Sequence, residues 1–242
     1  MTNKINDIKY TKLWLVVITI IAPIAYFNPF ISNILTPYFT FDVDVVFFYF
    51  NKVYLLDALS NGFLPLWSPG EGCGFPFFSS PHNQALYPLN FLAALYYKYF
   101  DGFSKIDYQR FSVLGISLFN VFLFLWLKVL KLPNRAALFA VLIICLSYGL
   151  AGTLNRIHAT HSMAWIMMIV WGLTLAMHQN KANKGAVVVA IGAWCLITTA
   201  YPYYLYYTVF LFPFYIAMLL LKNTQRAFIV GDENFINPKK YL

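Results

Sequence analysis

The chain has 242 residues, of which 60% are hydrophobic, 20% aromatic and 11% charged, and its formal net charge is +8. Soluble domains carry roughly 25% charged residues, so this composition excludes an ordinary soluble protein and predicts a polytopic membrane protein in a lipid bilayer. The basic residues are scattered through short gaps between apolar runs. They form no patch that would fit a nucleic acid, and we expect no nucleic-acid partner.

Six apolar segments have about the 20 residues that a helix needs to cross the hydrocarbon core. They are residues 13–35, 111–130, 136–154, 162–178, 185–201 and 203–221. The first segment follows several lysines and has no small-residue cleavage site after it, so we expect an uncleaved anchor rather than a signal peptide. The predicted fold class is an all-α polytopic membrane protein with about six transmembrane helices.

The basic residues between these segments predict the orientation. Most of them fall into gaps that share one face if the spans alternate: Lys4, Lys9, Lys12, Lys128, Lys131, Arg135, Lys181, Lys184, Lys222, Arg226, Lys239 and Lys240. The positive-inside rule makes that face cytoplasmic. We therefore expect a cytoplasmic N-terminus over 1–12, a large external loop over 36–110, five further spans within 111–221 and a cytoplasmic tail over 222–242.

The external loop has the composition of a small subdomain. Residues 45–59 and 86–100 are apolar with polar breaks and too short to span, so we expect two helices at the membrane interface. Residues 65–90 between them are rich in Gly, Pro and aromatic residues and nearly free of charge, which disfavours disorder. The external loop also holds most of the acidic residues: Asp42, Asp44, Asp57, Glu71, Asp101 and Asp107. Chemistry at the outer face is the natural expectation.

Two carboxylates, Asp42 and Asp44, precede the first interfacial helix. Residues i and i+2 share a face of an extended segment but lie about 200° apart on a helix, so we expect one of them to point into a site. A carboxylate beside aromatic residues at a membrane–water boundary is partly desolvated, which raises its pKa as a general base requires. The alternative is a capping role, since Asp before a helix often accepts its first free N–H groups.

A second polar group, Arg156, His158 and His161, lies in the expected outer turn between two spans. The i, i+3 spacing places both histidines on one helix face. With Arg156 they could hold a phosphate through charge-assisted hydrogen bonds. A divalent cation such as Mg²⁺ or Mn²⁺ could assist, although His-x-x-His without a third ligand is a weak metal signal. Capping of a turn by interfacial polar residues is the alternative.

A third polar group, His82, Asn83 and Gln84, lies inside the aromatic loop. Three consecutive hydrogen-bonding side chains suit recognition of a polyol such as a sugar, and ordinary loop polarity is the alternative. The chain has no Gly-rich Walker loop and no Gly-x-Ser-x-Gly motif. We therefore expect no soluble nucleotide donor, and an enzyme working at the outer face would take a lipid-linked one.

Four runs in the loop share a pattern of Pro, aromatic and polar residues. They are Asn61–Pro69 (NGFLPLWSP), Gly74–Phe77 (GFPF), Pro81–Gln84 (PHNQ) and Tyr87–Asn90 (YPLN). Together with the two aspartates before the loop and the later Arg156, His158, His161 and Trp165, they resemble the YfhO-type bacterial membrane proteins of the GT-C glycosyltransferase superfamily. The resemblance covers about residues 13–221. Members of that family are longer, so the chain is similar to their N-terminal portion.

The resemblance implies a GT-C-like glycosyltransferase in the bacterial cytoplasmic membrane. Such an enzyme takes a sugar from a polyprenyl-phosphate donor at the outer face and passes it to an envelope polymer or lipid acceptor. A carboxylate of the first external loop acts as base in that superfamily, which implies Asp44 as the catalytic residue here and Asp42 as second choice. By their chemistry, Arg156, His158 and His161 would attend the donor phosphate. The alternative is a non-catalytic or truncated membrane protein, transporter-like or a partner subunit.

Overall fold

The structure is a computed structural model that describes residues 13–21, 24, 43–70, 72–145, 156–177, 181–199 and 202–221. Apart from one β-bridge, its regular elements over these residues are helices. Besides a helix over residues 13–21, they are α3 (Val43–Ser60), η1 (Pro81–Asn83), α4 (Pro88–Phe100), α5 (Lys105–Val129), α6 (Asn134–Cys145), α8 (Ile157–Ala176), α9 (Ala182–Thr199) and α10 (Pro202–Leu220).

Four of these helices, α5, α8, α9 and α10, are long and apolar enough to cross a membrane. They correspond to the predicted spans 111–130, 162–178, 185–201 and 203–221. The counterpart of span 136–154 is α6, of which the structure describes 12 residues, fewer than a membrane span needs. Residues 146–155 lie outside the described residues, as does most of the predicted span 13–35. The structure therefore supports a helical membrane protein with four candidate spans.

Two helices begin earlier than the predicted spans. Helix α5 begins at Lys105, whereas the predicted span begins at 111, because Ser104 and Asp107 form a reciprocal capping box that satisfies free N–H groups at the helix start. Helix α8 begins at Ile157 and not at 162. His158 and His161 therefore belong to a candidate span and not to a turn, because their neighbours face α5 and not water.

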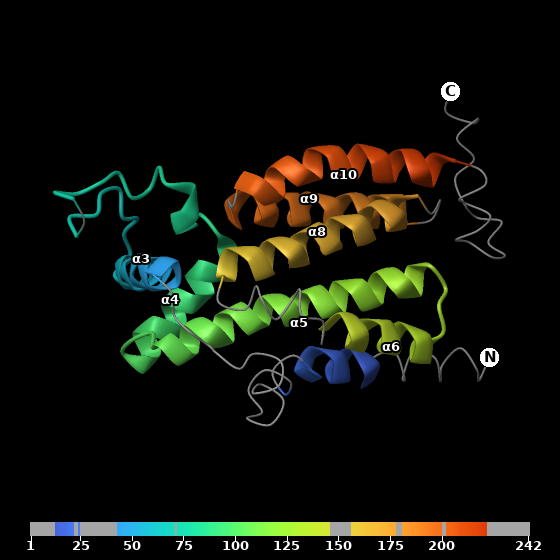
Figure 1. Cartoon of the computed structure of the whole chain (residues 1–242), viewed down its shortest axis with the longest axis horizontal. Helices are drawn as coiled ribbons and strands as arrows, with labels where there is room; N and C mark the ends of the chain where they lie inside the picture. The colour runs from blue at the N-terminus through green and yellow to red at the C-terminus, as the bar shows by residue number, and fades with distance from the viewer. Residues whose placement is uncertain are drawn as a thin grey trace.

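The bundle is centred on α8, which runs side by side with α5 and with α9 (Figure 1). Small residues allow the close approach: a side chain on Gly185 of α9 would collide with the backbone of Ala176 in α8. Lipid tails are as apolar as leucine, so van der Waals packing between such small residues is what holds membrane helices together. Within its apolar window α8 is 67% buried, against 11% for α10. Helix α10 is thus the outermost of the four.

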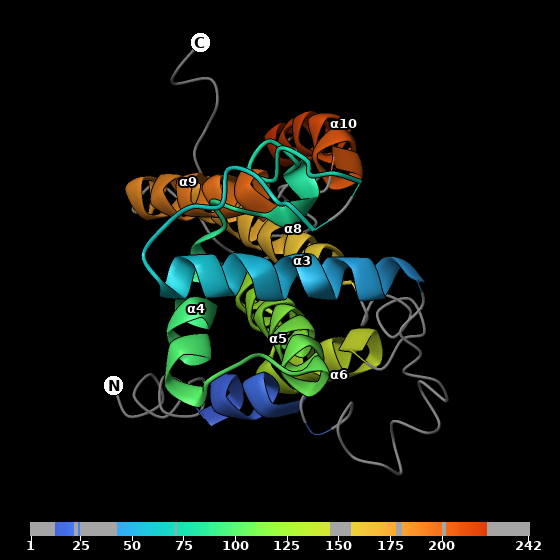
Figure 2. The same ribbon diagram turned by 90° about the vertical axis from the view of Figure 1, so that its left-hand side faces the viewer.

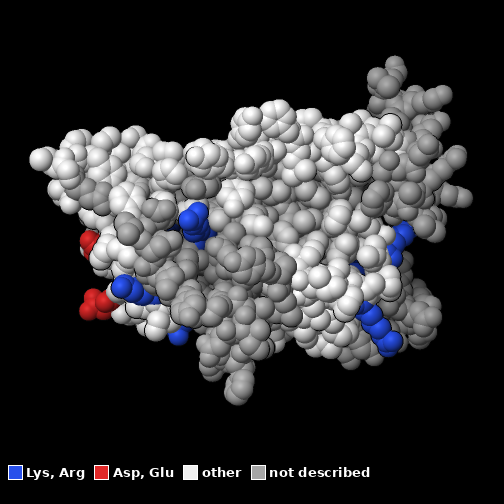
Figure 3. Space-filling view, in the orientation of Figure 1, with Lys and Arg blue, Asp and Glu red and all other residues white. Residues whose placement is uncertain are grey.

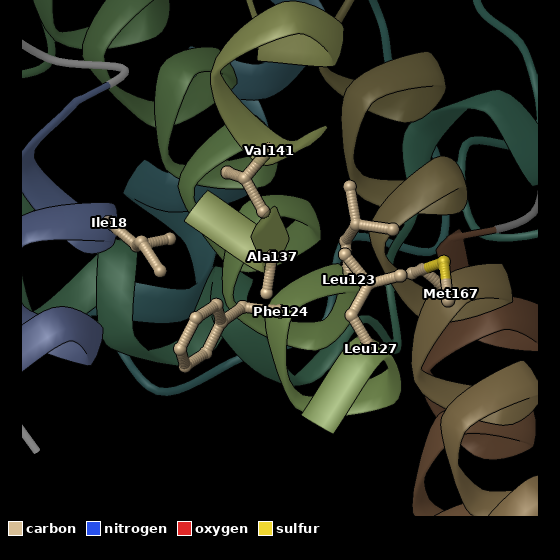
Figure 4. Close-up of a cluster of buried hydrophobic side chains, with 7 residues drawn as sticks. All are labelled: Ile18, Leu123, Phe124, Leu127, Ala137, Val141 and Met167. Carbon is tan, nitrogen blue, oxygen red and sulfur yellow. The ribbon is translucent and has the colours of Figure 1, made fainter. Parts of the chain in front are cut away.

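One cluster of buried side chains joins α5 and α6 to their neighbours. It consists of Ile18, Leu123, Phe124, Leu127, Ala137, Val141 and Met167, which come from the helix over 13–21, α5, α6 and α8 (Figure 4). Protein interiors are close-packed, so the loss of even one methylene group from such a cluster is felt. The cluster packs α6 against the bundle.

Helices α3 and α4 lie across one end of the bundle instead of running along it (Figure 2). Helix α3 ends at a Schellman motif: Phe63 N–H donates to Ala58 O, and Gly62 N–H donates to Leu59 O. Gly62 has φ +83°, a conformation that glycine adopts without strain. If the bundle axis follows the membrane normal, α3 and α4 lie parallel to the membrane surface, as expected for interfacial helices.

The two ends of the bundle differ in charge (Figure 3). On the face shown, acidic side chains appear only at the end that carries α3 and α4, where basic side chains also lie, whereas the opposite end shows basic side chains alone. The sequence agrees, because Lys128 lies in the last turn of α5, Lys131 follows that helix, Arg135 lies in the first turn of α6, and Lys181 precedes α9. This asymmetry is the pattern from which the positive-inside rule predicts orientation.

Candidate functional site

The loop after α3 has a shape fixed by its own hydrogen bonds. Ser68 and Phe75 exchange two backbone bonds of 2.9 Å, and the Tyr54 hydroxyl donates to Trp67 O over 2.8 Å. Gly74 has φ +100°, and a side chain there would overlap the Trp67 indole. The Asn83 amide donates to Phe77 O over 2.8 Å. These bonds place η1 and the residue after it against the end of the bundle.

Lys52 of α3 is the most informative residue at this end, and its side chain is 5% exposed. Its Nζ donates to Gln84 Oε1 over 2.7 Å and to Asn90 Oδ1 over 2.9 Å. It also lies 5.8 Å from the centroid of the Phe111 ring. Among the described residues no Asp or Glu forms an ion pair with it. Burial therefore lowers the pKa of Lys52 to about 7.

Protonation changes what Lys52 can bind. The neutral amine has two N–H groups, which match the two amide oxygens. The ammonium form has a third N–H, which finds no acceptor among the described residues. A buried cation with a spare donor favours an anionic ligand, and such a ligand would stabilise the charged form in return. The geometry thus suits the capture of a negatively charged oxygen.

Gln84 and Asn90 form the frame around Lys52. Gln84 adopts the left-handed conformation and its Nε2 donates to Thr199 O at the end of α9 over 3.0 Å. Asn90 Nδ2 donates to Gln84 O over 2.6 Å. Each amide thus offers Lys52 an oxygen while its nitrogen is bound elsewhere, which fixes the direction of both side chains. The frame links α3, the loop, α4 and α9.

A second hydrogen-bonded chain runs through His161 of α8, which is fully buried. His161 Nε2 lies 2.7 Å from Phe111 O, a carbonyl that can only accept, so this nitrogen carries the proton. In the neutral ring Nδ1 then accepts from the Tyr87 hydroxyl over 2.6 Å, and Tyr87 accepts from Trp165 Nε1 over 3.0 Å. Gly115 makes room, because a Cβ there would lie 2.5 Å from His161 Cδ2.

The Phe48 ring of α3 lies between two further histidines, His82 and His158. Its ring centroid lies 6.0 Å from that of His82 and 4.7 Å from that of His158. His158 is buried, and His82, Arg156, Lys52 and His161 are all near enough to act on it electrostatically. Arg156 directly precedes α8 and is exposed. Groups that are basic or can become so, from α3, η1 and α8, therefore converge at one end of the bundle.

Of the two predicted aspartates, Asp44 belongs to the same helix as Phe48 and Lys52. Asp44 lies in the first turn of α3, one turn before Phe48 and two turns before Lys52 along the same helix face. Eight residues of helix separate Asp44 from Lys52, or about 12 Å along the axis. The Asp44 side chain lies outside the described residues, and so does Asp42.

The structure divides the predicted binding residues into two groups. His82 and His158 contact Phe48, and Arg156 lies near His158, whereas Asn83, Gln84 and His161 are buried and hydrogen-bonded to protein groups. Within the part of the chain that the structure describes, no three His, Cys, Asp or Glu side chains are grouped to hold a metal ion. The site that is described is thus one of cations and amides.

Lys52, Asn90 and Tyr87 were not predicted as site residues. The signal for Lys52 was present, because Asn51 and Lys52 interrupt the apolar middle of a helix that also holds Phe47, Phe48 and Phe50. A lone cation in an apolar segment beside a membrane points to function or to a buried partner. Its partners are 32 and 38 residues away in sequence, and no local spacing reveals them.

Comparison of the chain with protein-family models, with curated proteins and with solved structures gave no match.

Proposed function

We propose that the chain is a membrane glycosyltransferase that takes a sugar from a polyprenyl-phosphate donor and passes it to an envelope polymer or lipid acceptor. The observation that carries the proposal is the convergence of Lys52, His82, Arg156 and His158 at the end of the bundle where α3 carries Asp44 in its first turn. A transferase of this kind needs cations for the leaving phosphate and a carboxylate for the attacking hydroxyl. Both kinds of residue belong to one end of the bundle.

The proposed reaction is a single displacement. Asp44 accepts the proton of the acceptor hydroxyl as its oxygen bonds to the anomeric carbon. The bond from that carbon to the phosphate oxygen breaks, and the phosphate keeps the electron pair. Lys52 in its ammonium form and Arg156 stabilise the negative charge that develops on the phosphate. A direct displacement inverts the anomeric configuration.

A transfer assay tests the proposal. Membranes that contain the 242-residue chain are supplied with radiolabelled polyprenyl-phosphate sugars, and label is followed into envelope polymers and lipids. We expect Asp44→Asn to lower transfer by about 10² to 10⁴, the usual effect of removing a general base. Asp57→Asn is the matched control, because Asp57 lies near the other end of α3 and bonds to Asn61. Unchanged transfer in both Asp44→Asn and Asp42→Asn would refute the mechanism.

A second candidate function rests on the outer helices. Within their apolar windows α9 is 28% and α10 11% buried, so both expose long apolar faces. Those faces suit further membrane helices as well as lipid, which favours a non-catalytic partner subunit or a portion of a longer enzyme. An inserted and stable chain that shows no transfer in the assay would favour this candidate.

A further inference from the structure

Two adjoining cavities lie where α4 meets the first turns of α5. The first, of about 420 Å³, is mainly apolar and lined by Leu92, Ala93, Phe103, Phe111 and Leu114. The second, of about 550 Å³, extends toward the α4–α5 turn and is lined in part by Asp101 and Ser104. Tyr96, Phe103, Asp107 and Arg110 line both. Each volume is in the range of small-molecule sites.

The boundary between the cavities carries a positioned cation. Arg110 is 62% exposed and donates to Asp107 Oδ1 over 3.0 Å. A guanidinium has five N–H groups, so most of its donors remain for a ligand. Asp107 is already bound by Ser104 and by the Tyr96 hydroxyl, so it holds Arg110 in place. Arg110 is well shaped for a phosphate, which it can bind through two parallel hydrogen bonds.

The two cavities together match an amphipathic molecule. The apolar one extends along α5, a candidate span, as far as Leu114, which is 39% exposed. The polar one contains the carboxylate of Asp101, which caps α4 and is exposed. A ligand with a chain, a phosphate and an amine would meet an apolar wall, Arg110 and Asp101 in that order.

We propose that these cavities bind one phosphatidylethanolamine molecule of the surrounding bilayer. An acyl chain occupies the apolar cavity, the phosphate binds Arg110, and the primary ammonium donates to Asp101. A net anionic headgroup such as phosphatidylglycerol fits less well, because the polar cavity is lined by two carboxylates. A choline headgroup has no N–H to donate. Phe111, which lines the apolar cavity, also lies near Lys52. The proposed lipid site does not depend on the proposed transfer reaction.

Native mass spectrometry of the detergent-solubilised chain tests the proposal. Dioleoyl-phosphatidylethanolamine, -phosphatidylglycerol and -phosphatidylcholine are titrated separately. We expect one phosphatidylethanolamine to bind preferentially, and Arg110→Gln to weaken it about tenfold, the effect of losing a charged hydrogen-bonding partner. Lys98→Gln on α4 is the matched control, since Lys98 is not among the residues that line the cavities. Equal binding by Arg110→Gln and the parent chain would overturn the proposal.

Two further variants separate the halves of the site. Leu114→Trp fills the apolar cavity and leaves every charge in place, so we expect it to weaken all three lipids. Asp101→Asn keeps a residue that tolerates the left-handed conformation found there, φ 52°. We expect it to abolish the preference for ethanolamine over choline. A preference for phosphatidylglycerol in the parent chain, or its failure to retain any of the three lipids, would also contradict the assignment.

Discussion

Two polar clusters are buried near opposite ends of the bundle, and they are built differently. Near the end away from α3, Trp126 Nε1 donates to Thr174 Oγ1 and to Tyr215 Oη, over 3.1 and 2.9 Å. Thr174 donates to Val170 O, so the Tyr215 hydroxyl donates to Thr174 over 2.6 Å. Every donor is used, no member is charged, and the cluster ties α5, α8 and α10 together. It has the properties of hydrogen-bonded contacts between membrane helices.

The cluster at the α3 end is charged and incomplete by comparison. Lys52 has a spare donor in its ammonium form, and the cluster draws its members from α3, the loop after it, α4 and the candidate span α9. A neutral cluster in which every donor is used holds the helices together at little cost. Burial of a cation with an unused donor lowers stability, and helix packing alone does not need such a group. The difference between the two ends is therefore the structural reason to place function beside Lys52.

The strongest way to break the α3-end cluster is to force α5 and α8 apart. We expect Gly115→Leu to destabilise the protein by about 3 kcal/mol, because the side chain would overlap Thr160 and His161. Thermal unfolding in detergent, followed by circular dichroism, measures the effect. Val187→Leu on the exposed face of α9 should be nearly neutral. Equal stability of the two variants would show that the α5–α8 contact is looser than described.

Removing the cation tests the cluster more directly. Lys52→Met keeps much of the volume but leaves Gln84 Oε1 and Asn90 Oδ1 without their donor. Buried acceptors left unpaired cost about 1 to 3 kcal/mol each, and loss of the buried amine offsets part of that. We expect a net destabilisation of about 2 kcal/mol at neutral pH in the same unfolding assay. A more stable variant would mean that desolvation of Lys52 outweighs its hydrogen bonds.

The free energy of unfolding should depend on pH, because the pKa of Lys52 differs between the folded and unfolded states. Its folded pKa of about 7 lies below the value of about 10.4 expected for an unfolded lysine. The unfolded state therefore binds more protons between pH 7 and 10, and the stability contributed by Lys52 rises with pH through that window. Below pH 7 the contribution is constant. The parent chain minus Lys52→Met gives the difference curve, and a flat curve would contradict the assigned pKa.

A smaller effect is expected from the neutral part of the same cluster. Tyr87→Phe removes one hydroxyl and leaves His161 Nδ1 and Trp165 Nε1 without their shared partner. We expect a loss of about 1.5 kcal/mol, the cost of unpaired buried groups. Fluorescence of Trp165 should shift as well, although five other tryptophans contribute to the signal. Unchanged stability would indicate that water replaces the hydroxyl.

The smallest effect should come from the neutral cluster at the other end. Thr174→Val removes the shared hydroxyl, and hydrogen bonds between membrane helices contribute about 0.6 kcal/mol on average. Transfer activity should not change, since Thr174 belongs to no part of the proposed site. A loss of transfer without a loss of stability would place function at the end of the bundle away from α3. It would contradict a purely structural role for the Trp126–Thr174–Tyr215 cluster.

Composition predicted several helices of this fold, including two short ones interrupted by polar residues. The helix expected over 45–59 is α3, and that expected over 86–100 is α4. Boundaries failed where polar residues continue a helix. Ser112 and Thr160 are polar, yet their hydroxyls lie 3.3 Å apart in the α5–α8 contact. A hydropathy pattern cannot distinguish a polar residue facing a neighbouring helix from one facing water.

Only part of the candidate site could be predicted, because a sequence does not show which groups a polar side chain faces. His82, His158 and Arg156 are noticeable in sequence because they belong to short polar groups in a largely apolar chain, and they do converge. Lys52 was missed because its importance depends on burial and on amides supplied from distant positions. The spacing of residues along a chain carries no information about such contacts.

The bond from Gln84 to Thr199 spans 115 positions in the sequence. At 5 to 20 residues per second, synthesis of that interval takes roughly 6 to 20 s. During this time the loop has been synthesised but the end of α9 has not. Gln84 therefore lacks its hydrogen-bond acceptor, Thr199 O. The cationic cluster is therefore completed late, after the described spans up to α9 have been made.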